Sequence, residues 1–337
     1  MENISRKTPI DRKVFGYVFL GVFALLLAVA FTLPLLKPKQ TEIPAAVVVA
    51  EPVPPPLTQP QITAAQENDS HWVEPLPAAP IAELQEPLGN GFIPITAPDG
   101  RVSWHSYARP YNQADARPRV TVVIGELGLS QQISQSAITD LPGPVTLIFS
   151  KYSNEPDAWM AKARQLGHET VLGIPMEPLD YPSSDPGPDS LLIHNNNDEN
   201  KALLLKYLVN GKGYIGVTSL SGSRMSTTPE RFRPILEELN KRGLMWLDAN
   251  LTPLSAGDIL CKEIRMPSAK VDVHIDENMG TNDITRILQD IEKSAFKNVH
   301  TILMVQPSPL SLSLLRDWIK QLPDKRISLA PLSSLAK

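Results

Sequence analysis

The stretch Val120-Thr121-Val122-Val123-Ile124-Gly125-Glu126 predicts how the larger part of this 337-residue chain folds. Every residue from Val120 to Ile124 is apolar except Thr121, which is typical of a strand buried on both faces of a parallel sheet. The apolar run stops at Gly125 and Glu126, where a glycine and a carboxylate follow. The stretch therefore predicts a buried strand that ends in a polar turn.

Short apolar runs of this kind recur along the chain after residue 119, and helical patterns separate them. We expect strands at 120–124, 145–149, 170–174, 214–218, 245–247, 271–275, 301–305 and 327–329. We expect helices at 155–166, 202–209, 229–242, 283–296 and around 314–318, with Asn282 as an N-cap and Gly243 as a C-cap. Repeated strand–helix units predict an α/β domain with a parallel sheet and right-handed crossovers. Both a (β/α) barrel and an open doubly wound sheet fit this order.

Carboxylates stand where four of the expected strands end, namely Glu126, Glu177, Asp248 and Asp276. In a barrel, the C-terminal ends of the strands form the face that holds the active site. A pair of carboxylates that flanks a sugar can hydrolyse a glycosidic bond. The alternative is a polar groove whose carboxylates accept hydrogen bonds from sugar hydroxyls.

Six blocks in a fixed order carry a resemblance to a known family. They are Val122-Val123-Ile124-Gly125-Glu126-Leu127-Gly128, Gly167-His168-Glu169, Pro175-Met176-Glu177-Pro178, Gly222-Ser223-Arg224, Leu247-Asp248 and Ile275-Asp276. Over residues 119–337 the chain resembles the divergent polysaccharide deacetylase family of bacterial envelope proteins. The resemblance implies an incomplete seven-stranded (β/α) barrel, and it implies a carbohydrate as the ligand.

The resemblance also locates a metal site whose ligands are missing from this chain. Active members are expected to carry an aspartate pair and two histidines. One aspartate and the histidines hold a divalent metal that activates water, and a second carboxylate serves as general base. Here Gly125 and Glu126 align with the aspartates, and Leu220 and Gln306 align with the histidines. Since leucine has no donor atom and glutamine is a poor zinc ligand, we expect no metal and no other cofactor.

The remaining candidates follow from position and residue type. We assign Glu126, Asp248 and Asp276 as catalytic candidates, and Glu177, Ser223, Arg224 and His274 as substrate-binding candidates. The turn at Ser223 and Arg224 either binds a carboxylate, as on a peptidoglycan stem, or closes the barrel while Arg224 pairs with a nearby acid. His274 is the only histidine near the C-terminal end of an expected strand. His168 precedes a strand, so we expect a structural role for it.

The N-terminal segment predicts a membrane anchor. Residues 14–36 are almost all apolar, and about 20 apolar residues are long enough to cross the hydrocarbon core. Basic residues in 1–13 place that end in the cytoplasm by the positive-inside rule. The alternative is a signal peptide cleaved after Ala28-Val29-Ala30. Both interpretations export the rest of the chain. We expect a single-pass protein of the bacterial inner membrane with its C-terminal domain in the periplasm.

A Pro-rich stretch follows the expected anchor, with Pro54-Pro55-Pro56 as its densest point. We expect residues 37–90 to be an extended tether, either a plain spacer or a docking motif for a partner. Residues 91–118 carry Phe92, Trp104, Tyr107 and Tyr111, and exposing several aromatics costs free energy. We therefore expect 91–118 to pack as an arm on the domain at 119–337.

Composition narrows the range of partners. The net charge of −4 argues against nucleic acid, which requires a basic surface, and the single Cys261 excludes an intramolecular disulfide. These observations predict a membrane-anchored periplasmic protein of envelope carbohydrate metabolism that binds a glycan such as peptidoglycan. One alternative is a residual carbohydrate hydrolase or deacetylase, either metal-independent or weakly metal-dependent, that uses Glu126 with Asp248 or Asp276. The other is a scaffold that regulates cell-wall hydrolases through its surface.

Overall fold

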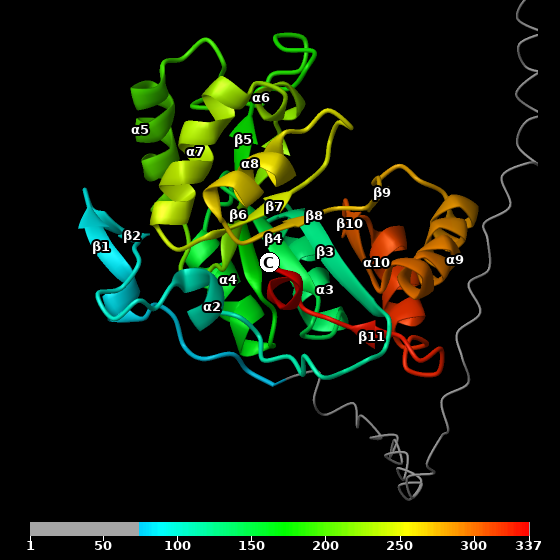
Figure 1. Ribbon diagram of the computed structural model, residues 1–337. Coiled ribbons are helices and arrows are strands. Elements are labelled where there is room, and N and C mark those ends of the chain that lie inside the picture. Colours follow the sequence, from blue (N-terminus) through cyan, green and yellow to red (C-terminus); the bar gives the residue numbers. More distant parts are fainter. Residues whose placement is uncertain (1–73, 337) are drawn as a thin grey trace, which may run out of the picture. The chain divides into compact units, whose positions relative to one another are not determined.

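The structure is a computed structural model that describes residues 74–336 (Figure 1). Its first elements are the 3₁₀ turn η3 (Ala82–Leu84), the hairpin β1 (Gln85–Leu88) and β2 (Gly91–Pro94), and the short helix α2 (Ser103–Ser106). The later strands are β3 (Arg119–Leu127), β4 (Thr146–Ser150), β5 (Thr170–Met176), β6 (Gly216–Ser221), β7 (Met245–Asp248), β8 (Ser268–Lys270), β9 (Val273–Ile275), β10 (His300–Val305) and β11 (Ser328–Leu329). The later helices are α3 (Gln131–Asp140), α4 (Pro156–Gln165), α5 (Asn197–Leu208), α6 (Ser223–Ser226), α7 (Pro229–Lys241), α8 (Gly257–Ile264), α9 (Thr281–Asn298) and α10 (Pro309–Ile319), followed by the turn η4 (Leu332–Leu335).

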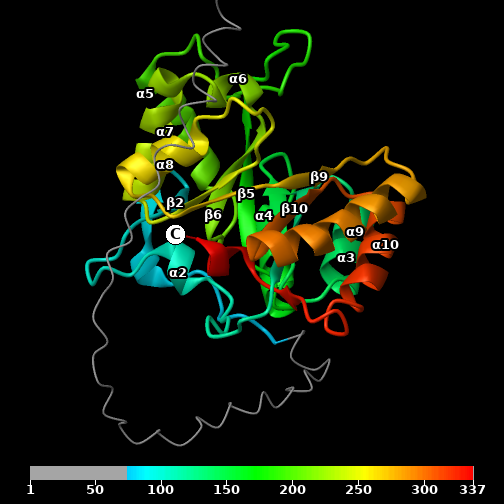
Figure 2. The ribbon, with the colours of Figure 1, turned by 45° about the vertical axis from the view of Figure 1, so that its right-hand side comes forward.

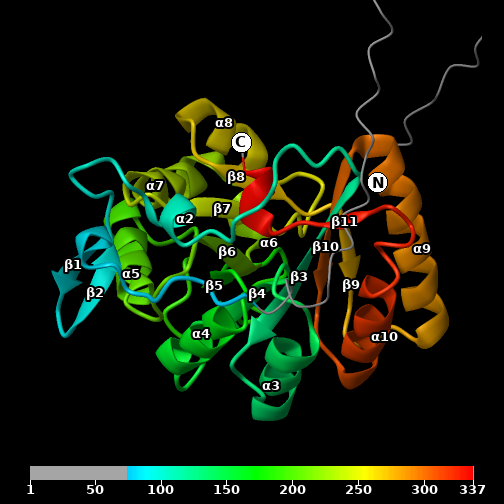
Figure 3. The same ribbon diagram turned by 90° about the horizontal axis from the view of Figure 1, so that it is seen from below.

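One curled parallel sheet organises these elements. Its strand order is β8-β7-β6-β5-β4-β3-β10-β9, and β11 pairs with the first residues of β3. The helices surround the sheet when it is viewed along the strands (Figure 3). This arrangement confirms the predicted α/β class and agrees with an incomplete barrel rather than a flat, open sheet, but eight strands lie along its path instead of the expected seven.

A single extended segment, residues 268–275, pairs with one strand at each end of the curled sheet. β8 pairs with β7, whereas β9 pairs with β10, and only Val271 and Asp272 separate β8 from β9. The Val271 N–H donates to the Asp248 carbonyl on one side, and the Asp272 N–H donates to the Ile302 carbonyl on the other. The strand expected at 271–275 is β9, whereas β8 was not expected. The two short strands have different partners because the sheet curls until β7 (Figure 1) and β10 (Figure 2) approach the same segment.

Apolar side chains pack on both faces of the sheet. On β3, Ile124 belongs to the outer core under the helices, whereas Val123 belongs to the inner core enclosed by the sheet. Both are fully buried, as are Leu247 and Leu332 of the inner core. Burial of each such side chain stabilises the fold by about 1.5–3 kcal/mol. Because both faces are covered, the strands read as continuous apolar runs in the sequence.

The residues before β3 pack against the N-terminal ends of the strands. The Tyr107 hydroxyl accepts a hydrogen bond from the Ile81 N–H, and the Arg164 guanidinium donates to the carbonyls of Tyr107 and Pro77. The expected boundary at Gly91 falls inside the β1–β2 hairpin, so β1 lies in the stretch expected to be tether. Strand pairing between Gln85–Leu88 and Gly91–Pro94 explains the difference, because a hairpin can include Pro87 at an edge.

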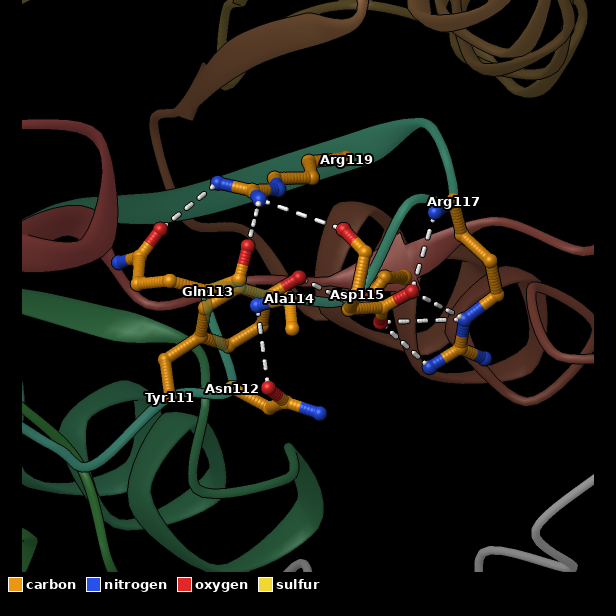
Figure 4. A network of polar contacts seen from close by, with 8 residues as sticks. Tyr111, Asn112, Gln113, Ala114, Asp115, Arg117 and Arg119 are labelled. Atoms are coloured by element: carbon orange, nitrogen blue, oxygen red, sulfur yellow. Dashed lines mark hydrogen bonds and ion pairs between the residues drawn. The ribbon is translucent and has the colours of Figure 1, made fainter. Parts of the chain in front are cut away.

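A polar network ties the last part of this arm to the start of β3 (Figure 4). Arg119 donates to the side-chain and backbone oxygens of Gln113, at 3.1 Å each. Burial alone would raise the pKa of Asp115, but hydrogen bonds from the Arg117 guanidinium and N–H lower it from 3.8 to about 2. Asp115 is therefore ionised, and its hydrogen bonds with Arg117 stabilise the segment before β3 at the N-terminal end of the sheet.

Several local predictions differ from the structure. The helices at Gln131–Asp140 and Gly257–Ile264 were not expected, and Asn282 lies inside α9, whose N-cap is Gly280. The C-cap of α7 is Arg242 rather than the expected Gly243, which follows it directly with φ 69°. Between residues 74 and 336, no helix has the length and apolar character needed to cross a membrane. The predicted anchor at 14–36 and most of the predicted tether lie outside the described residues.

Candidate functional site

A pocket of about 600 Å³ lies at the C-terminal ends of β3, β9 and β10. Its lining consists of Glu126, Asp276, Glu277, Asn278, Met279, Gly280, Asp283 and Gln306. Four of these residues carry carboxylates and none carries a positive charge, although Asp283 pairs with Arg286 at 2.8 Å. The pocket is therefore a strongly acidic, polar cleft at the face where barrel enzymes hold their ligands.

Glu126 reaches this pocket because β3 is irregular at its end. The pairing of β3 with β4 shifts register between Ile124 and Leu127, which marks a bulge. Glu126 sits in the bulge with φ 52°, a left-handed conformation that a glutamate adopts only at a cost of about 1 kcal/mol. Burial, and secondarily the negative charge of Glu277, raises the pKa of Glu126 above its usual value.

Other side chains fill the space around the positions that align with the metal ligands. A Cβ atom added to Gly125 would lie 3.2 Å from Gln306 Oε1 and 3.3 Å from the Met304 methyl carbon. Leu220 is 7 % exposed and occupies the space beside Gly173. In the described part of the chain, no group of three or more His, Cys, Asp or Glu residues is placed to hold a metal ion. This donor set does not fit the divalent metal that the family pattern implies.

The structure separates the two aspartates that were expected to face the mouth together. Asp276 is exposed in the pocket, beside Glu277. Asp248 is 4 % exposed, and its carboxylate accepts hydrogen bonds from the Asn250 N–H and the Ser255 hydroxyl. The expected position of Asp248 in the mouth is therefore wrong. Its side chain alternates with that of Leu247, which points into the inner core, and so it faces the loop before α8 instead.

Glu177 is also a buried anchor rather than an open carboxylate. It is 2 % exposed, it accepts a hydrogen bond from the Ile193 N–H, and Arg224 Nε lies 3.4 Å from its other oxygen. Ser223 accepts a hydrogen bond from the Leu179 N–H. Of the two interpretations of this turn, the geometry favours loop closure with an arginine–acid pair. About two fifths of the Arg224 side chain remains exposed.

The two histidines lie at opposite ends of the sheet. His274 of β9 pairs with Met304 of β10, which is an inner-core residue. The Nε2 atom of His274 is buried without a hydrogen-bond partner. Burial lowers the pKa of His274, while a hydrogen bond that its ring donates to the Ala249 backbone and the charge of Asp276 oppose that shift. His168 is fully buried at the start of β5, where its ring nitrogens lie 2.7 and 3.0 Å from the carbonyls of Val145 and Ile138. Its position agrees with the structural role expected for it.

Glu277 and Asp283 were not among the predicted site residues. The consecutive acids Asp276 and Glu277 after a strand were a usable signal, because a short loop at a strand end keeps both near the mouth. Asp283 had no such signal, since an acid in the first turn of a helix is common for dipole reasons alone. Its place in the pocket depends on how α9 packs beside β10.

Comparison with known proteins places this geometry in a family. A family model described as divergent polysaccharide deacetylase matches residues 122–336. The chain is 22 % identical to the uncharacterized protein YibQ of Escherichia coli (strain K12) over 218 residues, which is 64 % of this chain and 67 % of YibQ. The crystal structure of the uncharacterized protein ATU2773 from Agrobacterium tumefaciens C58 matches with TM-score 0.70 and 34 % identity, covering 73 % of this chain and 99 % of that one. The chain belongs to the divergent polysaccharide deacetylase family.

Proposed function

We propose that this chain is an envelope protein that binds a glycan, such as peptidoglycan, in the acidic pocket and does not catalyse metal-dependent deacetylation. One observation supports the proposal above the others. Glu126, Asp276 and Glu277 converge on an open pocket of about 600 Å³, the size typical of ligand sites, in a family named for its action on polysaccharides. Carboxylate oxygens accept hydrogen bonds from sugar hydroxyls, and the filled space at Gly125 argues against a metal.

Membrane anchoring through residues 14–36, with the domain in the periplasm, is part of the same proposal. Its support is the apolar run after the basic residues of 1–13. A protein held at the inner membrane by a Pro-rich tether would meet peptidoglycan by reaching outward. Protease accessibility of the domain in spheroplasts compared with intact cells tests this topology.

The test of glycan binding is co-sedimentation of the full chain with purified peptidoglycan sacculi. Neutralising the pocket with Glu126→Gln, Asp276→Asn and Glu277→Gln should reduce the bound fraction at least about tenfold, because three charged acceptors are lost. Asp290→Asn, on the exposed face of α9, is the matched control and should bind as the parent does. Full retention of binding by the triple variant would refute the proposed site.

A residual hydrolase remains the second candidate, and one observation favours it. The raised pKa of Glu126 suits a general acid, which must hold its proton near neutral pH. Asp276 is the open carboxylate that would partner it. Incubation with sacculi and assay of newly released reducing ends distinguishes the candidates, since a binding protein releases none and Glu126→Gln would abolish any release that a hydrolase shows.

A further inference from the structure

Four large apolar side chains are exposed on neighbouring segments at the C-terminal end of the sheet. Leu179 follows β5, Leu251 and Leu254 follow β7, and Ile259 lies in the first turn of α8. Their exposed fractions are 57 %, 43 %, 77 % and 60 %, respectively. We call these four residues the apolar patch. Apolar side chains that gather on a surface in this way mark interaction sites more often than scattered ones do.

The short helix α6 joins the two loops that carry the patch. The Leu179 N–H donates to the Ser223 hydroxyl at 3.0 Å, and the N–H groups of Arg224 and Met225 donate to the Glu177 carbonyl. At the other end of α6, the Ser226 carbonyl accepts a hydrogen bond from the Ala256 N–H at 2.9 Å. Both loops that carry the patch are thus attached to one four-residue helix.

Hydrogen bonds within the loop after β7 fix its backbone, and Leu251 and Leu254 remain exposed. Asp248 accepts hydrogen bonds from the Asn250 N–H at 2.8 Å and the Ser255 hydroxyl at 2.9 Å, and the Asn250 amide donates to the Val271 carbonyl. Asn250 has φ 49°, a conformation held here by those bonds. The polar groups of the loop therefore point inward, and residues 249–257 contain no charged side chain. A surface ordered before binding loses little entropy when a partner docks.

The charges around the patch select the kind of partner. Asp180 and Asp185 are exposed on the same loop as Leu179, and the acidic pocket opens at the same end of the sheet. Two bases near these segments are paired with acids: Arg224 Nε lies 3.4 Å from the Glu177 carboxylate, and Lys262, three residues after Ile259 on α8, pairs with Asp258 at 2.7 Å. Sugars bind to aromatic rings and polar groups rather than to leucines, and an anionic lipid surface would be repelled by these acids. We propose that the apolar patch docks a partner protein through a basic amphipathic helix, whose apolar face covers Leu251 and Leu254.

A synthetic peptide of 18 residues provides the probe, with leucine at helical positions i, i+3, i+4 and i+7 and lysine elsewhere. Its affinity for the full chain, immobilised by its N-terminus, is measured by surface plasmon resonance. We expect saturable binding that weakens at least about tenfold in Leu251→Glu/Leu254→Glu, and a similar loss for a peptide with glutamate in place of lysine. Phe296→Glu, at a side chain 59 % exposed on α9, is the matched control and should bind within about twofold of the parent.

Several outcomes would overturn the proposal. Binding that is absent, that is unchanged in the double variant, or that is equal for the lysine and glutamate peptides would contradict it. Sedimentation with vesicles of anionic lipid that depends on Leu251 and Leu254 would assign the patch to a membrane. A dimer that dissociates in the double variant would assign it to a second copy of this chain. Urea unfolding of each variant at the parent's midpoint excludes loss of fold as the cause of weaker binding.

Discussion

The two ends of the curled sheet differ in how their carboxylates are partnered. At the N-terminal end, Glu169 is fully buried, and it accepts hydrogen bonds from the N–H groups of Arg109 and Ser333 and from the Ser333 hydroxyl. At the C-terminal end, Asp276 and Glu277 line an open pocket without a cation of their own. The hydrogen bonds to Glu169 hold the arm and the C-terminal turn in place. At the other end Glu177 and Asp248 are also buried and hydrogen-bonded, whereas Asp276 and Glu277 are available to a ligand.

Left-handed backbone at residues other than glycine occurs at both ends of the sheet, since Val299 and Arg326, with φ of 71° and 56°, lie just before β10 and β11. Glu126, Ser221 and Asn250 follow or end β3, β6 and β7, with φ of 52°, 60° and 49°. Each of these left-handed residues costs about 1 kcal/mol, and such costs persist where a site requires them. Strain of this kind therefore does not distinguish the two ends, and the difference between them lies in how Glu169, Asp276 and Glu277 are partnered.

The largest effect that the comparison predicts is at Glu169. Glu169→Ala should lower the free energy of unfolding by about 3 kcal/mol, because it leaves several buried donors without an acceptor and detaches η4 from β5. Urea unfolding followed by tryptophan fluorescence measures the change. The matched variant Glu277→Ala, at the open end, should alter stability by less than about 0.5 kcal/mol. Equal losses in the two variants would erase the distinction between the ends.

A smaller effect is expected at the site of the missing metal ligand. Gly125→Ser should lower the free energy of unfolding by about 1–2 kcal/mol, since its Cβ would crowd Gln306 and Met304. Part of this loss should be recovered when Gln306→Ala is combined with Gly125→Ser, because the alanine removes one of the crowding side chains. Gly280→Ser is the control glycine: no atom lies within 4 Å of its added Cβ, and serine is a good N-cap for α9. If both serines are tolerated equally, then the space at Gly125 is open and metal binding must be reconsidered.

Much of the fold followed from local pattern. The strands β3, β5 and β10 lie where apolar runs predicted them, because a strand buried on both faces leaves a continuous signature in the sequence. Helix α3 was not predicted because its sequence is mostly polar and lacks a clear apolar stripe. Its buried residues are Ser134, Ala137 and Ile138. The exchange of partners between β8 and β9 has no local signature, because it depends on the curl of the whole sheet.

The candidate site was only partly predictable, for a related reason. Position at a strand end identified Glu126 and Asp276, which the structure brings to one pocket. The same rule chose Glu177 and Asp248, which are buried under loops. Whether a carboxylate at a strand end is open or covered depends on the loop that follows it, and the loops after β5 and β7 fold back through α6. That folding rests on contacts between segments far apart in sequence.

Two carboxylates at opposite ends of the sheet should show opposite pH dependence, and Asp115 at the N-terminal end should show the larger effect. Its pKa is about 2 in the folded chain against 3.8 ordinarily, so its contribution is present above pH 3.8 and is lost as pH falls towards 2. After allowance for solvent screening, Asp115→Asn should cost about 1 kcal/mol at pH 6 and progressively less below pH 4. Urea midpoints of parent and variant at pH 6 and pH 3 provide the measurement; a difference that grows on acidification would contradict this assignment.

Glu126 should show the smaller effect, with the opposite sign. Because the folded state raises its pKa, its protonated form favours folding; that contribution is complete below the ordinary pKa of 4.5 and is lost as pH rises through the folded value. Glu126→Gln should therefore match the parent at pH 4 and have a higher free energy of unfolding than the parent at pH 7. Carboxyl NMR titration of Glu126 gives an independent check, since Glu277→Gln removes a neighbouring charge and should bring its pKa closer to 4.5. A parent more stable than Glu126→Gln at pH 7 would mean that the Glu126 charge is satisfied within the folded chain, and the two ends of the sheet would then differ in solvent exposure alone.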